Sequence, residues 1–135
     1  HPQSIQKLKD KIRQITGRSN GMGIQRRKER LLQIVRGWVN YFKLADMKSI
    51  LKPLDEWMRS RIRMVVWKRW KKVKTRFANL KKLGLDEEWA WMWANTRKGY
   101  WRTAHSPILL RTLSNDRLKR AGYPNFYDYY LQVTV

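Results

Sequence analysis

The chain has 135 residues, of which 42% are hydrophobic and 13% aromatic, and its 31 Lys and Arg against 10 Asp and Glu give a net charge of +21. This hydrophobic and aromatic content predicts a folded protein and excludes a disordered basic tail. The absence of cysteine excludes disulfide scaffolds and cysteine-ligated zinc. Because like charges repel one another in a compact fold, so large a positive charge predicts a polyanionic partner.

The first half of the chain predicts three helices joined by short loops. Residues 2–16 carry apolar residues three and four apart, which is the period of an amphipathic helix. The glycine-rich segment GRSNGMG (17–23) predicts a loop. A second helix over residues 24–45 has a stripe formed by Leu31, Ile34, Val35, Trp38, Phe42 and Ala45. A third helix is expected from about Met47 to Lys72, with its own stripe from Leu54 to Val66. These helices predict a compact three-helix bundle in an all-α protein.

The second half predicts a smaller set of short helices. Residues 73–83 form a basic helix that Gly84 closes, and residues 85–97 form a helix that opens with the acidic run DEE, which suits a helix N-terminus. The stretch KGYWRTAHSP (98–107) predicts irregular structure. Short helices are expected at residues 107–113, 114–121 and 125–131. The domain boundary is therefore placed between residues 72 and 73, giving domains 1–72 and 73–135.

The sequence contains no recognisable catalytic or metal site. Asp55 and Glu56 are adjacent, which points them to different faces of a helix, so we expect helix-surface residues rather than an acid–base pair. His105 has no partner at metal-ligand spacing. The GMG of the first loop lacks the spacing of a phosphate-binding loop. No apolar run of about 18 residues, signal peptide or lipidation motif is present, so no membrane partner is expected.

The positive charge is concentrated in two runs that contain no acid, residues 11–28 and residues 59–82, the second with eleven Lys or Arg. Clustered cations bind a nucleic-acid backbone through the release of its counterions, and arginine adds bidentate phosphate contacts. The alternative is that such a run is only a solvated helix face. With a net charge of +21, the pattern favours nucleic acid.

The tryptophans favour structural roles. Trp38 lies on the stripe of the second helix and Trp57 flanks the stripe of the third, so both are expected in the core. Trp67 and Trp70 fall off that stripe, whereas Arg69 falls on it. We therefore expect the buried face to change near residue 67, where Trp67 and Trp70 anchor the following module. The alternative for these two rings is base stacking.

Several motifs, in order, resemble one family over essentially the whole chain. They are RGWVNYF (36–42), preceded by an LKDKIRQIT helix and a small-residue loop, then LDEWMRSRIRMVVWKRWKK, WANTRKGYWRTAHSPIL and the closing GYPNFYDYYLQV. Together they resemble the maturase-specific domain of group II intron-encoded reverse transcriptases, of the bacterial class C type. The residues that match the family signature are Arg36, Gly37, Trp38, Asn40, Tyr41 and Phe42.

The resemblance implies a non-catalytic C-terminal part of a larger RNA-directed DNA polymerase. Residues 1–72 would be the thumb, called domain X, which grips the RNA template–DNA primer duplex and the intron RNA, and residues 73–135 the DNA-binding domain, which engages target DNA. The finger and palm domains upstream would hold the YADD aspartates and Mg²⁺. Since this chain has neither YADD nor cysteine pairs and begins at His1, we expect a fragment with no polymerase or endonuclease activity and no cofactor of its own. The expected location is the bacterial cytoplasm, in association with RNA and the nucleoid.

The predicted function is therefore binding that supports intron splicing, reverse transcription and retrohoming. On the thumb surface, the residues expected to contact nucleic acid are Lys7, Lys11, Arg13, Arg18, Arg26, Arg27 and Arg36. In the second half they are Lys68, Lys71, Lys72, Lys74, Arg76, Lys81, Arg97, Lys98 and Arg102. Gly37, which has no side chain, would permit the close approach of another helix or of RNA. The alternative function is a basic, Trp-rich protein-interaction module of a nucleic-acid-associated protein.

Overall fold

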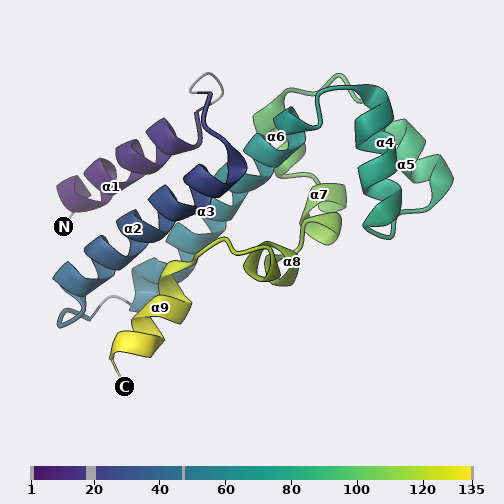
Figure 1. The fold of residues 1–135 in the computed structure, drawn as a ribbon. Coiled ribbons are helices and arrows are strands. Elements are labelled where there is room, and N and C mark those ends of the chain that lie inside the picture. Colours follow the sequence, from purple (N-terminus) through teal and green to yellow (C-terminus); the bar gives the residue numbers. More distant parts are fainter. Residues whose placement is uncertain (1, 18–20, 47, 135) are drawn as a thin grey trace.

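The computed structural model describes residues 2–17, 21–46 and 48–134, and over these residues the protein is all-helical, without strands. The elements are α1 (Pro2–Ile15), α2 (Ile24–Phe42), α3 (Lys48–Arg69), α4 (Val73–Lys82), α5 (Glu87–Ala94), α6 (Tyr100–Ala104), α7 (Pro107–Thr112), α8 (Asn115–Arg120) and α9 (Phe126–Val133) (Figure 1). The predicted all-α class is confirmed.

The long helices α1, α2 and α3 lie side by side with alternating directions (Figure 1). Their inward faces repeat at three and four residues, as the sequence predicts. The buried side chains of the three are Leu8, Ile12, Ile15, Leu31, Val35, Val39, Leu51, Leu54, Met58 and Ile62. Trp38 and Phe42, which were expected in the core, are only partly buried and pack against it. The bundle is as predicted, with Val39 instead of these two rings at its centre.

The buried face of α3 changes at its C-terminal end. Trp67 is 1% exposed and Trp70 is half-buried, with their ring centroids 6.1 Å apart, whereas Arg69 is exposed. This confirms the expected change of face near residue 67. Trp67 belongs to the same core cluster as Leu80 of α4. The end of α3 therefore joins the bundle to the helices that follow.

Helices α4 and α5 form a hairpin at the opposite end of the molecule from the N-terminus (Figure 1). Gly84 follows the C-terminal end of α4 and has a φ of +100°, in the left-handed region that favours glycine. Asp86 then caps α5, because its carboxylate accepts a hydrogen bond from the backbone nitrogen of Trp89 at 2.8 Å. The first turn of α5 also holds Glu87 and Glu88, as expected for the positive end of a helix.

The prediction of irregular structure for residues 98–107 is wrong, since this stretch contains α6 and the start of α7. Helix α6 packs on α3, with Thr103 and Ala104 fully buried between them. Five residues are too few to show a helical period in the sequence. Small side chains at the contact let α6 approach α3 closely, and this contact stabilises a helix that would be marginal alone.

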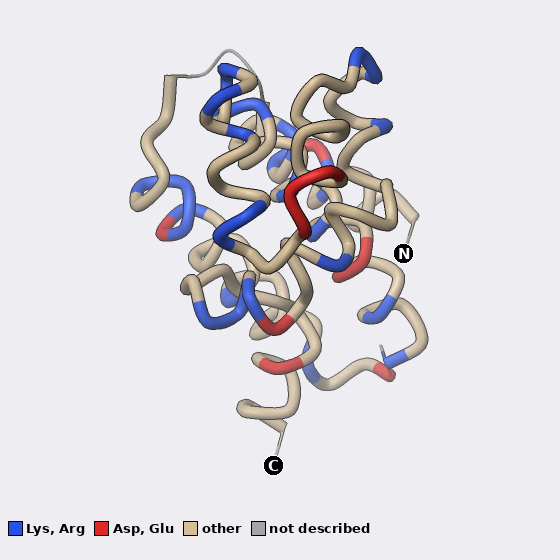
Figure 2. The backbone as a smooth tube through the Cα atoms, turned by 90° about the vertical axis from the view of Figure 1, so that its right-hand side faces the viewer, with Lys and Arg blue, Asp and Glu red and all other residues tan. Residues whose placement is uncertain are grey.

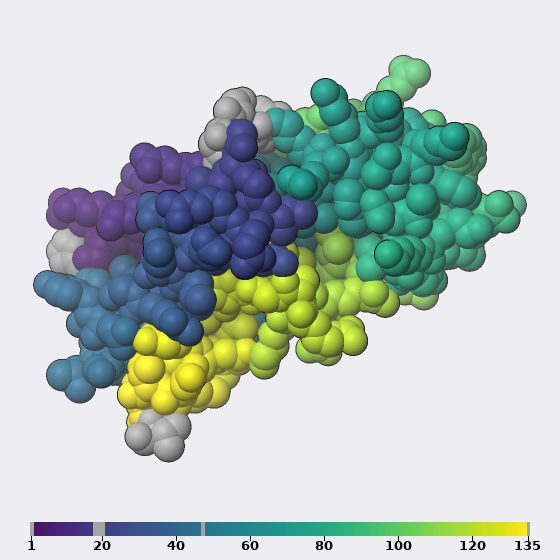
Figure 3. Space-filling model, viewed as in Figure 1, coloured from purple at the N-terminus to yellow at the C-terminus, as the bar shows by residue number. Residues whose placement is uncertain are grey.

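The last helix, α9, returns to the first half of the chain and packs on both α2 and α3. Figure 3 shows it as the yellow surface that lies directly against α2. Asp55 of α3 is 2% exposed, and its carboxylate accepts hydrogen bonds from the backbone nitrogens of Phe126 at 2.6 Å and Tyr127 at 3.1 Å. The expectation that Asp55 lies on the helix surface is therefore wrong.

A buried arginine makes a second link between α3 and the later helices. Arg63 is 3% exposed, its Nε donates to the carbonyl of Leu113 at 2.7 Å, and one terminal nitrogen donates to Asn115 at 2.8 Å. Burial lowers the pKa of Arg63 to about 10. One core cluster extends from Leu8 in α1 to Tyr130 in α9. The domain boundary at residue 72 stays a prediction, and helices on both sides of it share this core.

Candidate nucleic-acid interface

The two acid-free runs meet in the folded protein. A cavity of ≈ 160 Å³ is lined on one side by residues that flank or begin α2 and on the other by the last turns of α3. Its lining residues are Gly17, Gly21, Met22, Arg27, Val65, Lys68 and Arg69. Arg27 therefore lies at the same end of the bundle as Lys68 and Arg69, which are some forty residues later in the sequence. This proximity strengthens the positive electrostatic potential at that end.

The most concentrated positive surface is the link between α3 and α4, which we call the α3–α4 junction. It consists of Lys68, Arg69, Lys71, Lys72 and Lys74. All of these side chains are exposed except that of Lys68, which is half-buried. Figure 2, which looks at this end of the molecule, shows Lys and Arg distributed over several neighbouring segments.

The junction places cations where a helix disfavours them. The first turn of α4 has no acidic residue, and its N-cap, Lys72, makes no side-chain capping hydrogen bond. The N-terminus of a helix carries a partial positive charge, so Lys71, Lys72 and Lys74 are unfavourable neighbours for it. A bound anion would relieve both the lysine repulsion and the uncapped amides. The arrangement therefore suits a phosphate backbone.

Two contacts between Arg76 and aromatic rings hold the junction in shape. The guanidinium carbon of Arg76 lies 4.4 Å from the ring centroid of Trp67 and 5.9 Å from that of Tyr100. A terminal nitrogen of Arg76 also lies 3.5 Å from the carbonyl of Trp67. Arg76 was predicted to contact nucleic acid, but it is half-buried and its charge faces these rings. The structure gives Arg76 a positioning role, and its contact with nucleic acid stays a prediction.

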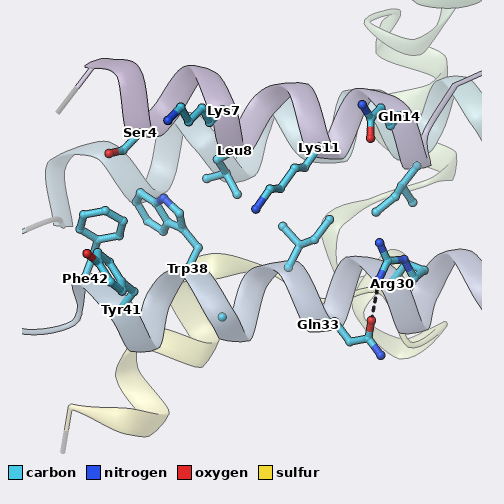
Figure 4. A pocket seen from close by; sticks show the side chains of 13 residues that line it. Ser4, Lys7, Leu8, Lys11, Gln14, Arg30, Gln33, Trp38, Tyr41 and Phe42 are labelled. Carbon is cyan, nitrogen blue, oxygen red and sulfur yellow. Dashed lines mark hydrogen bonds between the residues drawn. The ribbon is translucent and has the colours of Figure 1, made fainter.

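A groove of ≈ 640 Å³ separates α1 from α2 (Figure 4). Lys7 and Lys11 extend into it from α1, and Arg30 lies on the opposite rim, where it donates to Gln33 at 2.9 Å. None of the described residues that line the groove is acidic. Tyr41, which is 82% exposed, lies at one end. The groove thus combines cationic rims with an exposed aromatic ring, as nucleic-acid sites do.

Gly37 forms part of the groove wall on α2. A Cβ atom at this position would meet nothing within 4 Å, so the backbone there is open to the groove. No helix of the described structure lies within 4 Å of such a Cβ atom, so the predicted close approach of another helix is not seen there, and the approach of RNA stays a prediction. Arg30, which follows Glu29 just beyond the acid-free run of residues 11–28, was not among the predicted contacts. Its spacing of four from Ile34 and seven from Gly37 was the available signal.

Arg27 was predicted to lie on the thumb surface, and this placement is wrong. Arg27 is 6% exposed, and its Nε donates to the carbonyl of Ile15 at 2.9 Å. Burial lowers the pKa of Arg27, and the charge of Arg69 lowers it further. Arg27 therefore joins the start of α2 to the end of α1. Arg18, predicted from the same run, lies outside the described residues.

Arg36 is exposed as predicted, but its guanidinium carbon lies 5.7 Å from the ring centroid of Tyr129 in α9. The side-chain amide of Asn40 donates to the hydroxyl of Tyr129 at 2.8 Å. Trp38 meets Phe126 edge to face, with ring centroids 5.7 Å apart. The motif RGWVNYF therefore contacts the closing motif GYPNFYDYYLQV. On this side the signature residues hold α9 in place.

The remaining predicted cations are exposed but dispersed. Arg13 pairs with Asp10 at 2.9 Å and lies over Trp57, and Arg26 lies 3.9 Å from Glu29. Lys81 lies over Phe77, and Lys98 over Trp93. The others, which are exposed at the α4–α6 end, are Arg97 and Arg102. The structure thus gathers part of the predicted set in the groove and the junction, and leaves the rest apart.

The described residues offer no metal centre, since they contain no group of three or more His, Asp or Glu side chains that could hold an ion. His105 lies with its Nδ1 at 2.8 Å from the carbonyl of Trp101, which accounts for one of its ring nitrogens. None of the described helices combines the length and the apolar character that crossing a bilayer needs.

The family model of the group II intron maturase-specific domain matches residues 5–84. The chain belongs to this family. The match to the maturase-specific domain covers α1 to α4, so it includes both the groove and the α3–α4 junction. Residues 85–134, with α5 to α9, lie beyond it. A maturase-specific domain acts in the splicing of group II introns, and intron RNA is the partner that membership implies. A comparison with curated proteins finds no match.

Proposed function

We propose that this maturase-specific domain binds structured group II intron RNA through the α3–α4 junction and the α1–α2 groove, and that it does so without making or breaking bonds. The observation that carries the proposal is the meeting of the two acid-free runs at one end of the bundle. Structured RNA presents closely spaced phosphates that a rigid, clustered cationic surface matches.

The two surfaces would divide the work by chemistry. The lysines of the junction act as point charges for phosphates, next to the uncapped start of α4. In the groove, Lys7, Lys11 and Arg30 flank a wall at whose end the exposed ring of Tyr41 would stack on an unpaired base. A rigid scaffold lowers the entropy lost on binding, and the buried Trp67 and the half-buried Arg76 supply it at the junction.

The finer assignments belong to the same proposal and rest on the motif resemblance. They are the bacterial class C type, the grip on an RNA template–DNA primer duplex, and the contact of residues 73–135 with target DNA. They also include finger and palm domains upstream that hold Mg²⁺, a role in reverse transcription and retrohoming, and a cytoplasmic location with RNA and the nucleoid. The chain itself would contribute binding and no cofactor.

The test measures the affinity of the protein for a structured group II intron RNA as a function of salt. For wild type, the affinity should fall steeply with added salt, with a slope that grows by roughly 0.7–0.9 for each phosphate neutralised. The triple variant K71E/K72E/K74E should bind more weakly, with a shallower slope and unchanged helix content by circular dichroism. A salt-independent affinity for the wild type contradicts the proposal.

The matched control is K43E/K48E/K52E, which makes the same charge change near the N-terminal end of α3. The junction lies at the C-terminal end of this helix, which is about 33 Å long. All three of these lysines are exposed. Its loss of affinity should be the smaller of the two, because only the long-range field changes. Equal losses for both variants would show that net charge alone drives binding and that the junction is no site.

A further inference from the structure

Helix α5 exposes an aromatic face that the RNA-binding proposal does not use. Trp89 is 48% exposed, and Trp91 and Met92 are each 54% exposed. Glu88 lies three and four residues before Trp91 and Met92, and Trp89 lies three before Met92, so these side chains are neighbours on one side of the helix. The opposite side of α5 is buried through Ala90 and Ala94. We call the exposed side, with Glu87 added, the α5 face.

The α5 face is acidic in a protein that is otherwise strongly basic. Asp86, Glu87 and Glu88 are three of only ten acids in the chain and form the continuous red segment that faces the viewer in Figure 2. Asp86 is occupied as the cap of the helix. Neither Glu87 nor Glu88 has an ion-pair partner among the described residues, whereas Asp10, Glu29 and Asp128 each have one. These glutamates are therefore available to a partner.

We propose that the α5 face binds a protein segment rich in Lys or Arg and carrying a few apolar side chains. Indole rings attract cations to their faces, and the adjacent glutamates pair with the same cations. The apolar groups of such a segment would cover the half-exposed Trp89 and Met92. The face thus offers both of the features by which a basic amphipathic segment is recognised.

The charges decide against the two other occupants. A nucleic-acid strand stacked on Trp89 or Trp91 would bring its phosphates next to Glu87 and Glu88. These negative charges would repel one another. A second copy of this chain would bring a further +21 charges against the first, and this repulsion opposes association. A separate basic segment brings fewer charges and places them where the acids lie.

The experiment uses the full chain and two fluorescent peptides, one of Arg, Leu and Ala and a matched one in which Glu replaces Arg. Binding is measured by fluorescence anisotropy. The Arg peptide should bind and the Glu peptide should not. The variant E87Q/E88Q should bind the Arg peptide roughly tenfold more weakly, and W89A/M92A should lose a similar factor. The control E29Q/E56Q makes the same charge change on α2 and α3 and should leave the peptide affinity unchanged.

Other outcomes overturn the proposal. If E29Q/E56Q weakens peptide binding as much as E87Q/E88Q, the peptide senses net charge and not the α5 face. If W89A/M92A weakens binding of a single-stranded oligonucleotide and spares the peptide, the face stacks bases. If sedimentation shows wild-type dimers that E87Q/E88Q abolishes, the occupant is a second copy. Neither E87Q/E88Q nor W89A/M92A should weaken the binding of structured RNA, so this test stands apart from that of RNA binding.

Discussion

The carboxylate of Asp55, in the middle of α3, lies 2.6 Å from the backbone nitrogen of Phe126, the first residue of α9 and 71 positions later in the chain. A second oxygen accepts from Tyr127 at 3.1 Å, so one acidic side chain satisfies two amides that the start of a helix leaves unpaired. Asn125 caps the same helix locally, because its side-chain oxygen accepts a hydrogen bond from the backbone nitrogen of Asp128. Asp55 therefore does more than cap α9: it also fixes the position of this helix on the bundle.

Replacing Asp55 by alanine should loosen α9. The change leaves the buried amide of Phe126 and the partly buried amide of Tyr127 without their acceptor, which costs about 1–3 kcal/mol for a buried unsatisfied group. Urea unfolding measures the loss of stability, and hydrogen exchange should show faster exchange in α9 than in α1. The control is Glu56→Ala on the same helix, where the side chain is exposed and the expected change is within about 0.5 kcal/mol. Equal losses for the two variants would contradict the capping role.

The pH dependence of stability should separate Asp55 from Asp128. Burial raises the pKa of Asp55 above its ordinary 3.8, although the two amide hydrogen bonds oppose the shift. The folded state then takes up this proton before the unfolded chain does, so the contribution of Asp55 is greatest at low pH and is lost as pH rises through the folded pKa. The unfolding free energy of wild type minus that of Asp55→Asn should therefore decrease as pH rises above 3.8 and level off above the folded pKa.

Asp128 should show the opposite sign. Its hydrogen bond with Lys119 at 2.8 Å, and that with Asn125, lower its pKa below 3.8. A carboxyl with a lowered pKa contributes stability above its unfolded pKa, and the contribution disappears as pH falls through the folded pKa. The difference between wild type and Asp128→Asn should therefore increase with pH over the acid range and be flat near neutrality. Curves of the same sign for both residues would contradict these assignments.

Gly37 offers a test in which stability and binding should move in opposite directions. Alanine at this helical position meets no atom within 4 Å and restricts the unfolded chain, so Gly37→Ala should stabilise the protein by about 0.4–1 kcal/mol. Gly37→Leu should fold as well, because its side chain enters the open groove, yet it should weaken RNA binding. Thermal unfolding and RNA titration of both variants give the two readouts. Unchanged RNA affinity for Gly37→Leu would remove the groove from the interface.

Trp38 should prove to be structural. Its ring lies 5.0 Å from that of Phe42 and 5.7 Å from that of Phe126, so truncation to alanine opens space between α2 and α9. Because the ring is only partly buried, we expect a loss of about 3 kcal/mol, at the low end for a large aromatic residue. Tyr41→Ala is the control, since that ring is 82% exposed and its loss should cost less than about 0.5 kcal/mol. Chemical denaturation of both variants measures the contrast.

Helices α1 to α3 could be predicted from a long, repeated apolar period, and the short helices α4, α5 and α7 to α9 were also predicted from the sequence. The apolar stripes of α1 to α3 predict which face of each helix is buried. Arg69, at a stripe position of α3, indicates where the buried face of that helix ends. Helix α6 could not be predicted, because its five residues become helical through contact with α3. The position of Arg27 was wrong for a related reason. A charged side chain is expected at the surface from the sequence alone, because the carbonyl of Ile15 that accepts from Arg27 is brought to it only by the fold.

The sequence by itself determined that the chain is helical, strongly basic and marked by the motifs of a maturase-specific domain, since period, charge and motif are properties of local order along the chain. Only the tertiary structure decided which charges act together. It brought Gly21, Met22 and Arg27 next to the end of α3, turned Arg27 and Arg76 inward, and placed α9 on Asp55. Those outcomes depend on contacts between segments far apart in the chain, whose energies arise only when the shared core brings them together.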